Sequence, residues 1–191
     1  MQENKNLFRK KLHQKSYLSK KAEIWVSVVI YTLIGITAIG LILVALQPRI
    51  NEARDSITIK QTIEAMHNFD SALRSTLIAP GNKRVLELKL GEGEMQIDSE
   101  NDMIFWSMKS SKKYSEPGFE IREGNIISLT EPGNPWKVTL SLKYEGLADI
   151  SYNSQQQTRI LQKAGKSYSL SIENQGSVPG QVPVVDIKQR A

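Results

Sequence analysis

The sequence contains a stretch of 23 residues, residues 24–46, in which no side chain is charged. A helix of about 20 apolar residues spans the hydrocarbon core of a bilayer, which is roughly 30 Å thick, because each residue adds about 1.5 Å. The stretch is longer than the apolar core of a secretory signal peptide, which has about 7–15 residues. It also lacks the polar face that a surface helix of a soluble protein would carry. We therefore predict a transmembrane helix over residues 22–47.

Basic residues are concentrated before this helix. Residues 1–21 contain seven Lys or Arg and one acid, whereas the other 170 residues contain 18 bases and 19 acids. Lys and Arg that flank a membrane helix hold their end in the cytoplasm. Residues 1–21 are thus predicted to be a basic cytoplasmic leader, and the chain beyond the helix is predicted to be extracellular. The folded part has no excess of basic residues, so a nucleic-acid partner is not expected.

Residues 48–80 have the pattern of an amphipathic extension of the same helix. Pro48 follows the apolar stretch, and Pro80 and Gly81 mark the end of the pattern, which predicts a helix from about residue 22 to residue 79. Apolar side chains recur mostly at steps of three and four, at Ile50, Ala53, Ile57, Ile63, Met66, Phe69, Leu73 and Leu77. Of these we expect Ile63, Met66, Phe69 and Leu73 to pack against a sheet.

Residues 81–191 have the alternating pattern of strands. The clearest case is residues 136–144, in which Trp, Val, Leu and Tyr alternate with Lys, Thr and Ser. Residues 119–123 and 125–130 flank Gly124, as expected for a hairpin. We expect seven to nine short strands in hairpin order, forming an antiparallel sheet whose apolar face is covered by the amphipathic helix. The predicted fold class is α+β, and without cysteine its core has no disulfide bonds.

The sequence offers few groups for catalysis or ligand binding. It has two histidines, His13 in the leader and His67 in the amphipathic segment. Asp98, Glu100 and Asp102 alternate like calcium ligands, but Met103 stands where the calcium loop of an EF-hand needs glycine, which favours a solvated turn. We therefore expect no catalytic residues, no metal and no cofactor, and a protein that is not an enzyme.

The apolar stretch contains small residues at a spacing of three, Thr32, Gly35 and Ala38. In lipid, helices associate through small residues that let their backbones approach closely. These three residues are therefore predicted to form a face for helix–helix assembly.

The junction between leader and helix reads Lys20, Lys21, Ala22 and Glu23. A basic leader, a small residue, an acid, an apolar helix, an amphipathic helix and then a sheet together resemble a type IV pilin. The closer resemblance is to archaeal pilin-like proteins, whose leader is a class III signal peptide. The resemblance implies that a prepilin peptidase reads Lys20 and Lys21 and leaves Ala22 as the new N-terminus. It also implies self-association into a filament through the apolar helix, in which Glu23 would take part.

Two positions depart from the pilin pattern. Lys21 stands where glycine or alanine usually precedes the cleavage site, and Glu23 would be the second mature residue, whereas bacterial pilins have a glutamate at the fifth. The alternative is a single-pass membrane-anchored surface protein that does not polymerise, such as an accessory subunit, an adhesin or a sensor. Loss or retention of residues 1–21 distinguishes the two.

Overall fold

The computed structural model describes the secondary structure of residues 3–190 and the side chains of residues 25–190. The chain divides into two compact units, Met1–Pro48 and Arg49–Ala191. One helix and ten strands are present in the described range: α1 (Glu3–Thr76), β1 (Lys83–Leu88), β2 (Glu94–Asp98), β3 (Met103–Ser110), β4 (Glu120–Glu123), β5 (Ile126–Glu131), β6 (Trp136–Lys143), β7 (Asp149–Tyr152), β8 (Thr158–Gln162), β9 (Tyr168–Gly176) and β10 (Val184–Arg190).

Helix α1 is longer at its start and shorter at its end than the sequence pattern indicated. It begins at Glu3, in a segment without glycine or proline, and includes Pro48 in its interior. It ends at Thr76, where the backbone N–H of Leu77 donates to the carbonyl of Arg74 at 3.1 Å and closes the last turn. Pro80 and Gly81 follow within five residues and prevent the helix from continuing.

The strands form two sheets, so the expectation of one antiparallel sheet in hairpin order is wrong. The six-stranded sheet has the order β4-β5-β6-β3-β2-β8, and each pair in it is antiparallel. The predicted hairpin across Gly124 is present, since β4 pairs with β5 and Glu123 lies opposite Ile126. Strand β8, which the alternation did not reveal, completes this sheet by pairing with β2.

The four-stranded sheet has the order β1-β9-β10-β7 and is mixed. Strand β9 pairs antiparallel with β1 and β10, whereas β10 and β7 run parallel. Strands β1 and β2 follow each other across a glycine-rich turn and yet belong to different sheets. Gly93 in this turn has a φ of +78° and lies so close to the carbonyl of Ser107 that a Cβ atom would collide with it.

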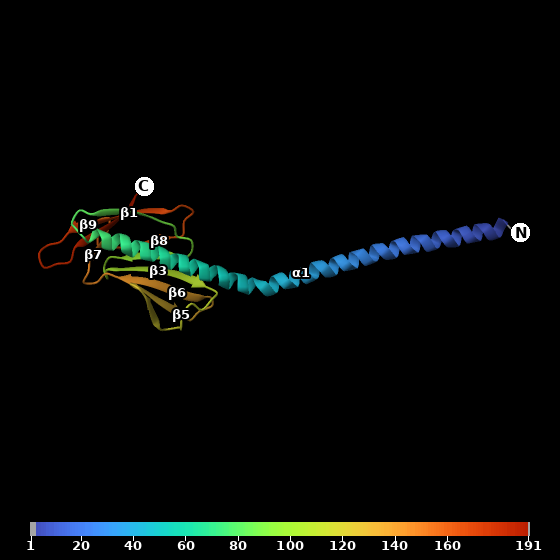
Figure 1. The fold of residues 1–191 in the computed structure, drawn as a ribbon, viewed down its shortest axis with the longest axis horizontal. Helices are drawn as coiled ribbons and strands as arrows, with labels where there is room; N and C mark the ends of the chain where they lie inside the picture. Colours follow the sequence, from blue (N-terminus) through green and yellow to red (C-terminus); the bar gives the residue numbers. More distant parts are fainter. Residues whose placement is uncertain (1–2, 191) are drawn as a thin grey trace. The chain divides into compact units, whose positions relative to one another are not determined.

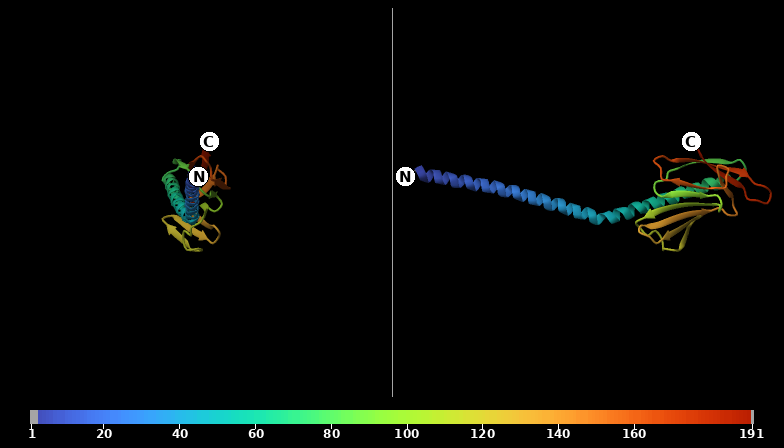
Figure 2. Two further views of the ribbon diagram at one scale, coloured as in Figure 1. Left: turned by 90° about the vertical axis from the view of Figure 1, so that its right-hand side faces the viewer. Right: turned by 180° about the vertical axis from the view of Figure 1, so that it is seen from behind.

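The second part of α1, residues 49–76, lies against both sheets (Figures 1 and 2). One cluster of buried apolar side chains contains residues of this part of the helix and of both sheets. The four helix residues expected to face a sheet are buried, with exposed fractions of 6% for Ile63, 1% for Met66 and 0% for Phe69 and Leu73. Ile59 joins them at 1%, whereas Ile57, which shares the same sequence pattern, is 57% exposed. The helix therefore enters the core at Ile59.

Candidate functional site

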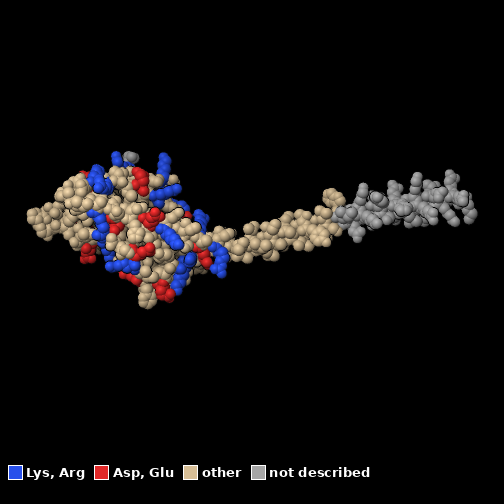
Figure 3. Space-filling view, viewed as in Figure 1, with Lys and Arg blue, Asp and Glu red and all other residues tan. Residues whose placement is uncertain are grey.

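The apolar part of α1 has no protein cover. Each described side chain from residue 25 to residue 51 is exposed, including Trp25 at 76% and Leu41 at 68%. Figure 3 shows no Lys, Arg, Asp or Glu along the described apolar stretch. The residues from Trp25 to Leu46 cover about 32 Å as a helix, which matches a hydrocarbon core of roughly 30 Å. By length and composition, this helix is able to cross a membrane.

The two threonine hydroxyls within the apolar stretch are satisfied by the helix itself. The hydroxyl of Thr32 donates to the carbonyl of Val28 at 2.7 Å, and that of Thr37 donates to the carbonyl of Leu33 at 2.8 Å. Neither hydroxyl therefore needs water as an acceptor for its proton, which suits an apolar environment.

The predicted assembly face of Thr32, Gly35 and Ala38 is on the exposed surface of α1. Apart from the adjacent residues and the backbone of the helix itself, no heavy atom lies within 4 Å of the position that a Cβ atom of Gly35 would occupy. The surface at this glycine is open to the close approach of another backbone, as small residues in membrane helices allow. That other helices pack here stays a prediction.

The proposed processing residues Lys20, Lys21 and Ala22, and the proposed assembly residue Glu23, lie outside the residues whose side chains the structure describes. Their roles remain predictions from the sequence.

A buried carboxylate holds the second part of α1 in a fixed orientation on the sheets. Asp70 is 5% exposed, and both of its oxygens accept hydrogen bonds from Nε of Arg74, at 2.9 and 3.0 Å. It also accepts from Nδ2 of Asn125 at 2.7 Å and from the hydroxyl of Tyr144 at 3.1 Å. Burial and the charge of Asp70 raise the pKa of Tyr144 well above its ordinary value, so the phenol stays a donor. The network links α1 to the β4–β5 turn and to the end of β6.

A second carboxylate of α1 holds the loop after β3. Oδ2 of Asp55 accepts from the backbone N–H of Ser111 at 2.6 Å and from its hydroxyl at 2.5 Å. The sequence reasoning missed both Asp55 and Asp70. The sequence could have indicated Asp70, because it lies between Phe69 and Leu73 on the apolar side of the helix, where a carboxylate needs buried hydrogen-bond partners.

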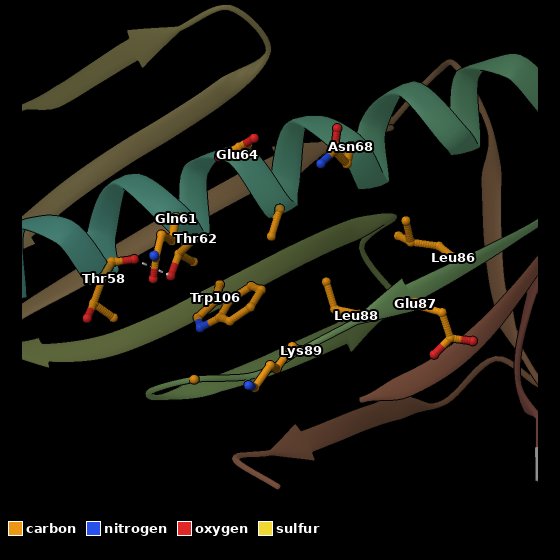
Figure 4. A pocket seen from close by; sticks show the side chains of 12 residues that line it. Thr58, Gln61, Thr62, Glu64, Asn68, Leu86, Glu87, Leu88, Lys89 and Trp106 are labelled. Carbon is orange, nitrogen blue, oxygen red and sulfur yellow. Dashed lines mark hydrogen bonds between the residues drawn. The ribbon is translucent and has the colours of Figure 1, made fainter. Parts of the chain in front are cut away.

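A groove of about 520 Å³ runs between α1 and β1 (Figure 4). The helix side offers Thr58, Gln61 and Asn68, and the strand side offers Glu87 and Lys89. Within residues 25–190 the single histidine, His67, does not line this groove. It is half-buried instead, with Cε1 3.2 Å from the position that a Cβ atom of Gly124 would take. The groove thus lacks a histidine to activate a nucleophile.

Two of the three acids that alternate in the calcium-like segment, Asp98 and Asp102, accept hydrogen bonds from the protein itself. Asp98 accepts from the backbone N–H of Asn101 at 3.3 Å and from its Nδ2 at 2.8 Å. Asp102 accepts from the backbone N–H of Ile150 at 2.7 Å. Burial raises the pKa of Asp102, and the bond from Ile150 offsets part of this effect. No group of three or more His, Cys, Asp or Glu suited to a metal ion occurs in the part of the chain that the structure describes.

Comparison of the chain with models of protein families, with curated proteins and with solved structures found no match.

Proposed function

We propose that this chain is a pilin-like structural subunit of a type IV pilus-like surface filament, assembled through its apolar helix after the leader is removed. The proposed role is structural and not enzymatic. The observation that carries the proposal is the difference in side-chain burial between the two parts of α1. Its second part completes the core of the β domain, residues 49–191, whereas the apolar stretch stays exposed in each described residue.

An exposed apolar helix of this length needs an apolar partner. Lipid is one such partner, and a bundle of identical helices is another, so assembly would move the helix from one to the other without contact with water. The internally bonded hydroxyls of Thr32 and Thr37 suit both environments. The small face at Thr32, Gly35 and Ala38 supplies a surface for close packing in the bundle.

Removal of the leader would control when the helix moves from lipid into the bundle. The seven bases of the leader are each worth about 1 kcal/mol near an anionic membrane surface, so their removal would ease extraction of the subunit. Cleavage before Ala22 would also create an ammonium group one residue from Glu23. In a water-poor bundle these charges can pair.

The test is the intact mass and N-terminal sequence of the surface protein, with and without a co-expressed prepilin peptidase. We expect loss of residues 1–21 only when the peptidase is present. Recovery of the full-length chain alone would refute the pilin assignment. Glu23→Gln should still be cleaved but should assemble poorly, and normal filaments from this variant would remove Glu23 from the assembly mechanism.

The small face has a matched test within the same helix. Gly35→Leu should reduce filament yield strongly, whereas Gly40→Leu should not, because five residues place the two glycines about 140° apart on the helix. Both positions are exposed, and outside the helix backbone and the adjacent residues no heavy atom lies within 4 Å of the place that a Cβ atom would take, so both substitutions should be tolerated by the subunit itself. Equal effects of the two substitutions would remove the specific role of Thr32, Gly35 and Ala38.

The second candidate is a permanently anchored surface protein that does not polymerise. It is favoured by the lysine at position 21, where pilins usually have a small residue before the cleavage site. In that case the basic leader stays on the mature protein, and the mass measurement described above finds it there.

A further inference from the structure

A pocket of about 440 Å³ lies where the ends of β7 and β10 meet the start of β8. Its charged side chains are two arginines, Arg159 of β8 and Arg190 of β10, and no Asp or Glu lines it. The other lining residues are all polar or aromatic and carry three carboxamides and two hydroxyls, from Asn153, Gln157, Gln189, Thr158 and Tyr152. The charged groups of the pocket are therefore all positive.

The two arginines have no acidic partner among the residues whose side chains the structure describes. Among the described residues, neither Arg159 nor Arg190 forms an ion pair with a carboxylate, and both side chains are exposed. Two positive charges that share one pocket repel each other, and a bound anion removes this repulsion. The charge of the pocket is thus complementary to an anion.

The neighbouring carboxylate of Asp186 does not neutralise the pocket, because other groups occupy it. It accepts from the hydroxyl of Ser151 at 3.1 Å, from the backbone N–H and hydroxyl of Ser154 at 2.7 and 2.9 Å, and it pairs with Nζ of Lys188 at 2.9 Å. Burial opposes the ionised form of Asp186, but these hydrogen bonds outweigh it and lower its pKa. The charge of Asp186 is therefore balanced by Lys188.

One backbone hydrogen bond and two side-chain contacts hold the walls of the pocket. Asn153 has a φ of +53° in the turn after β7, and its N–H donates to the carbonyl of Ile187 in β10 at 3.0 Å. Nε2 of Gln157 donates to the carbonyl of Tyr152 at 3.3 Å. The guanidinium of Arg159 lies over the ring of Tyr152, 5.8 Å from its centroid. A guanidinium at this distance from a ring is within the range of a cation–π contact, which leaves its N–H groups available to an oxyanion.

We propose that this pocket binds the carboxylate of a small hydroxylated molecule, such as an acidic sugar. The planar fork of arginine matches a carboxylate, and the carboxamides both donate to and accept from hydroxyl groups. The volume is within the range of roughly 300–1,000 Å³ that is typical of small-molecule sites. This binding site is independent of filament assembly, so it would serve either candidate function.

The test is a titration of the full chain in detergent with D-glucuronate, followed by isothermal calorimetry, with D-glucose as the neutral match. We expect saturable binding of glucuronate, no binding of glucose, and weaker binding at about 0.5 M salt than at about 0.05 M. Arg159→Gln and Arg190→Gln should each weaken binding at least about tenfold. The matched control is Arg122→Gln, which removes an exposed arginine of β4 outside the pocket and should leave binding unchanged.

Absence of glucuronate binding, or equal binding of glucose, would overturn the proposal. An equal loss of glucuronate affinity in the Arg122→Gln control would overturn it too, because the loss would then follow from the net charge of the protein and not from the pocket. Arg159→Lys keeps the charge and removes the fork, so it should bind glucuronate more weakly than the wild type and more tightly than Arg159→Gln.

Discussion

Replacing Ile59 by alanine tests whether α1 completes the core of the β domain. Ile59 is 1% exposed and is the first residue of α1 in the buried cluster. Ile57 provides a matched control, because it is the same residue type in the same helix, two positions earlier, and it is 57% exposed. The two substitutions delete the same atoms and differ in the environment from which the atoms are removed.

The expected costs differ severalfold. Full burial of an isoleucine side chain is worth about 1.5–3 kcal/mol, and the cavity left by truncation raises the cost of Ile59→Ala to about 2–5 kcal/mol. Ile57→Ala loses less buried area, and alanine favours the helix by up to about 0.7 kcal/mol, so its net effect should stay within about 1 kcal/mol. A cost of about 3 kcal/mol in a domain of this size lowers the unfolding midpoint by about 6–12 °C.

The assay is thermal unfolding of the full chain in detergent, followed by near-ultraviolet circular dichroism. Trp106 is buried in the β domain and reports its tertiary packing. Midpoints of the two variants that differ by less than about 2 °C would refute the packing of α1 described above, because they would mean that Ile59 is no better covered than Ile57.

Three further outcomes are expected. Gly124→Ala should destabilise the domain by about 1–2 kcal/mol in a chemical denaturation experiment, because Gly124 has a φ of +62° and a methyl group there would contact His67. Gly91→Ala is the control and should be nearly neutral, because the space around Gly91 is open. Asp102→Asn should raise the unfolding midpoint at pH 7. Because the pKa of Asp102 is raised in the folded protein, native stability falls as pH rises from the ordinary carboxyl pKa of about 3.9 through the folded value. Asparagine has no such charge, and its amide oxygen can still accept from the backbone N–H of Ile150. Below that pH window the variant and the wild type should have the same midpoint, and a lowered midpoint of the variant at pH 7 would contradict the reasoning. Protease added to intact spheroplasts should digest the β domain and spare an N-terminal tag, and the reverse pattern would refute the orientation drawn from the basic leader.

The sequence by itself determined the features that depend on local periodicity. A stretch of 23 uncharged residues predicts a helix able to span a membrane, whatever follows it. Steps of three and four residues placed Ile63, Met66, Phe69 and Leu73 on one side of a helix, and the structure buries all four. Gly124 between two alternating segments predicted the β4–β5 hairpin, because a tight turn joins neighbouring antiparallel strands.

Tertiary structure decided which strands pair and where the helix enters the core. A period of two tells which residues of a strand share a face, but it does not name the strand's partner. Strands β1 and β2 are neighbours in sequence and separate into two sheets, whereas β10 finds β7 as a parallel partner from more than 30 residues away. Ile57 and Ile59 have the same side chain, and only the packing of the sheets against α1 exposes one and buries the other. The same long-range packing brings Asn125 and Tyr144 to Asp70, because a buried carboxylate is stable only where distant parts of the chain supply its donors.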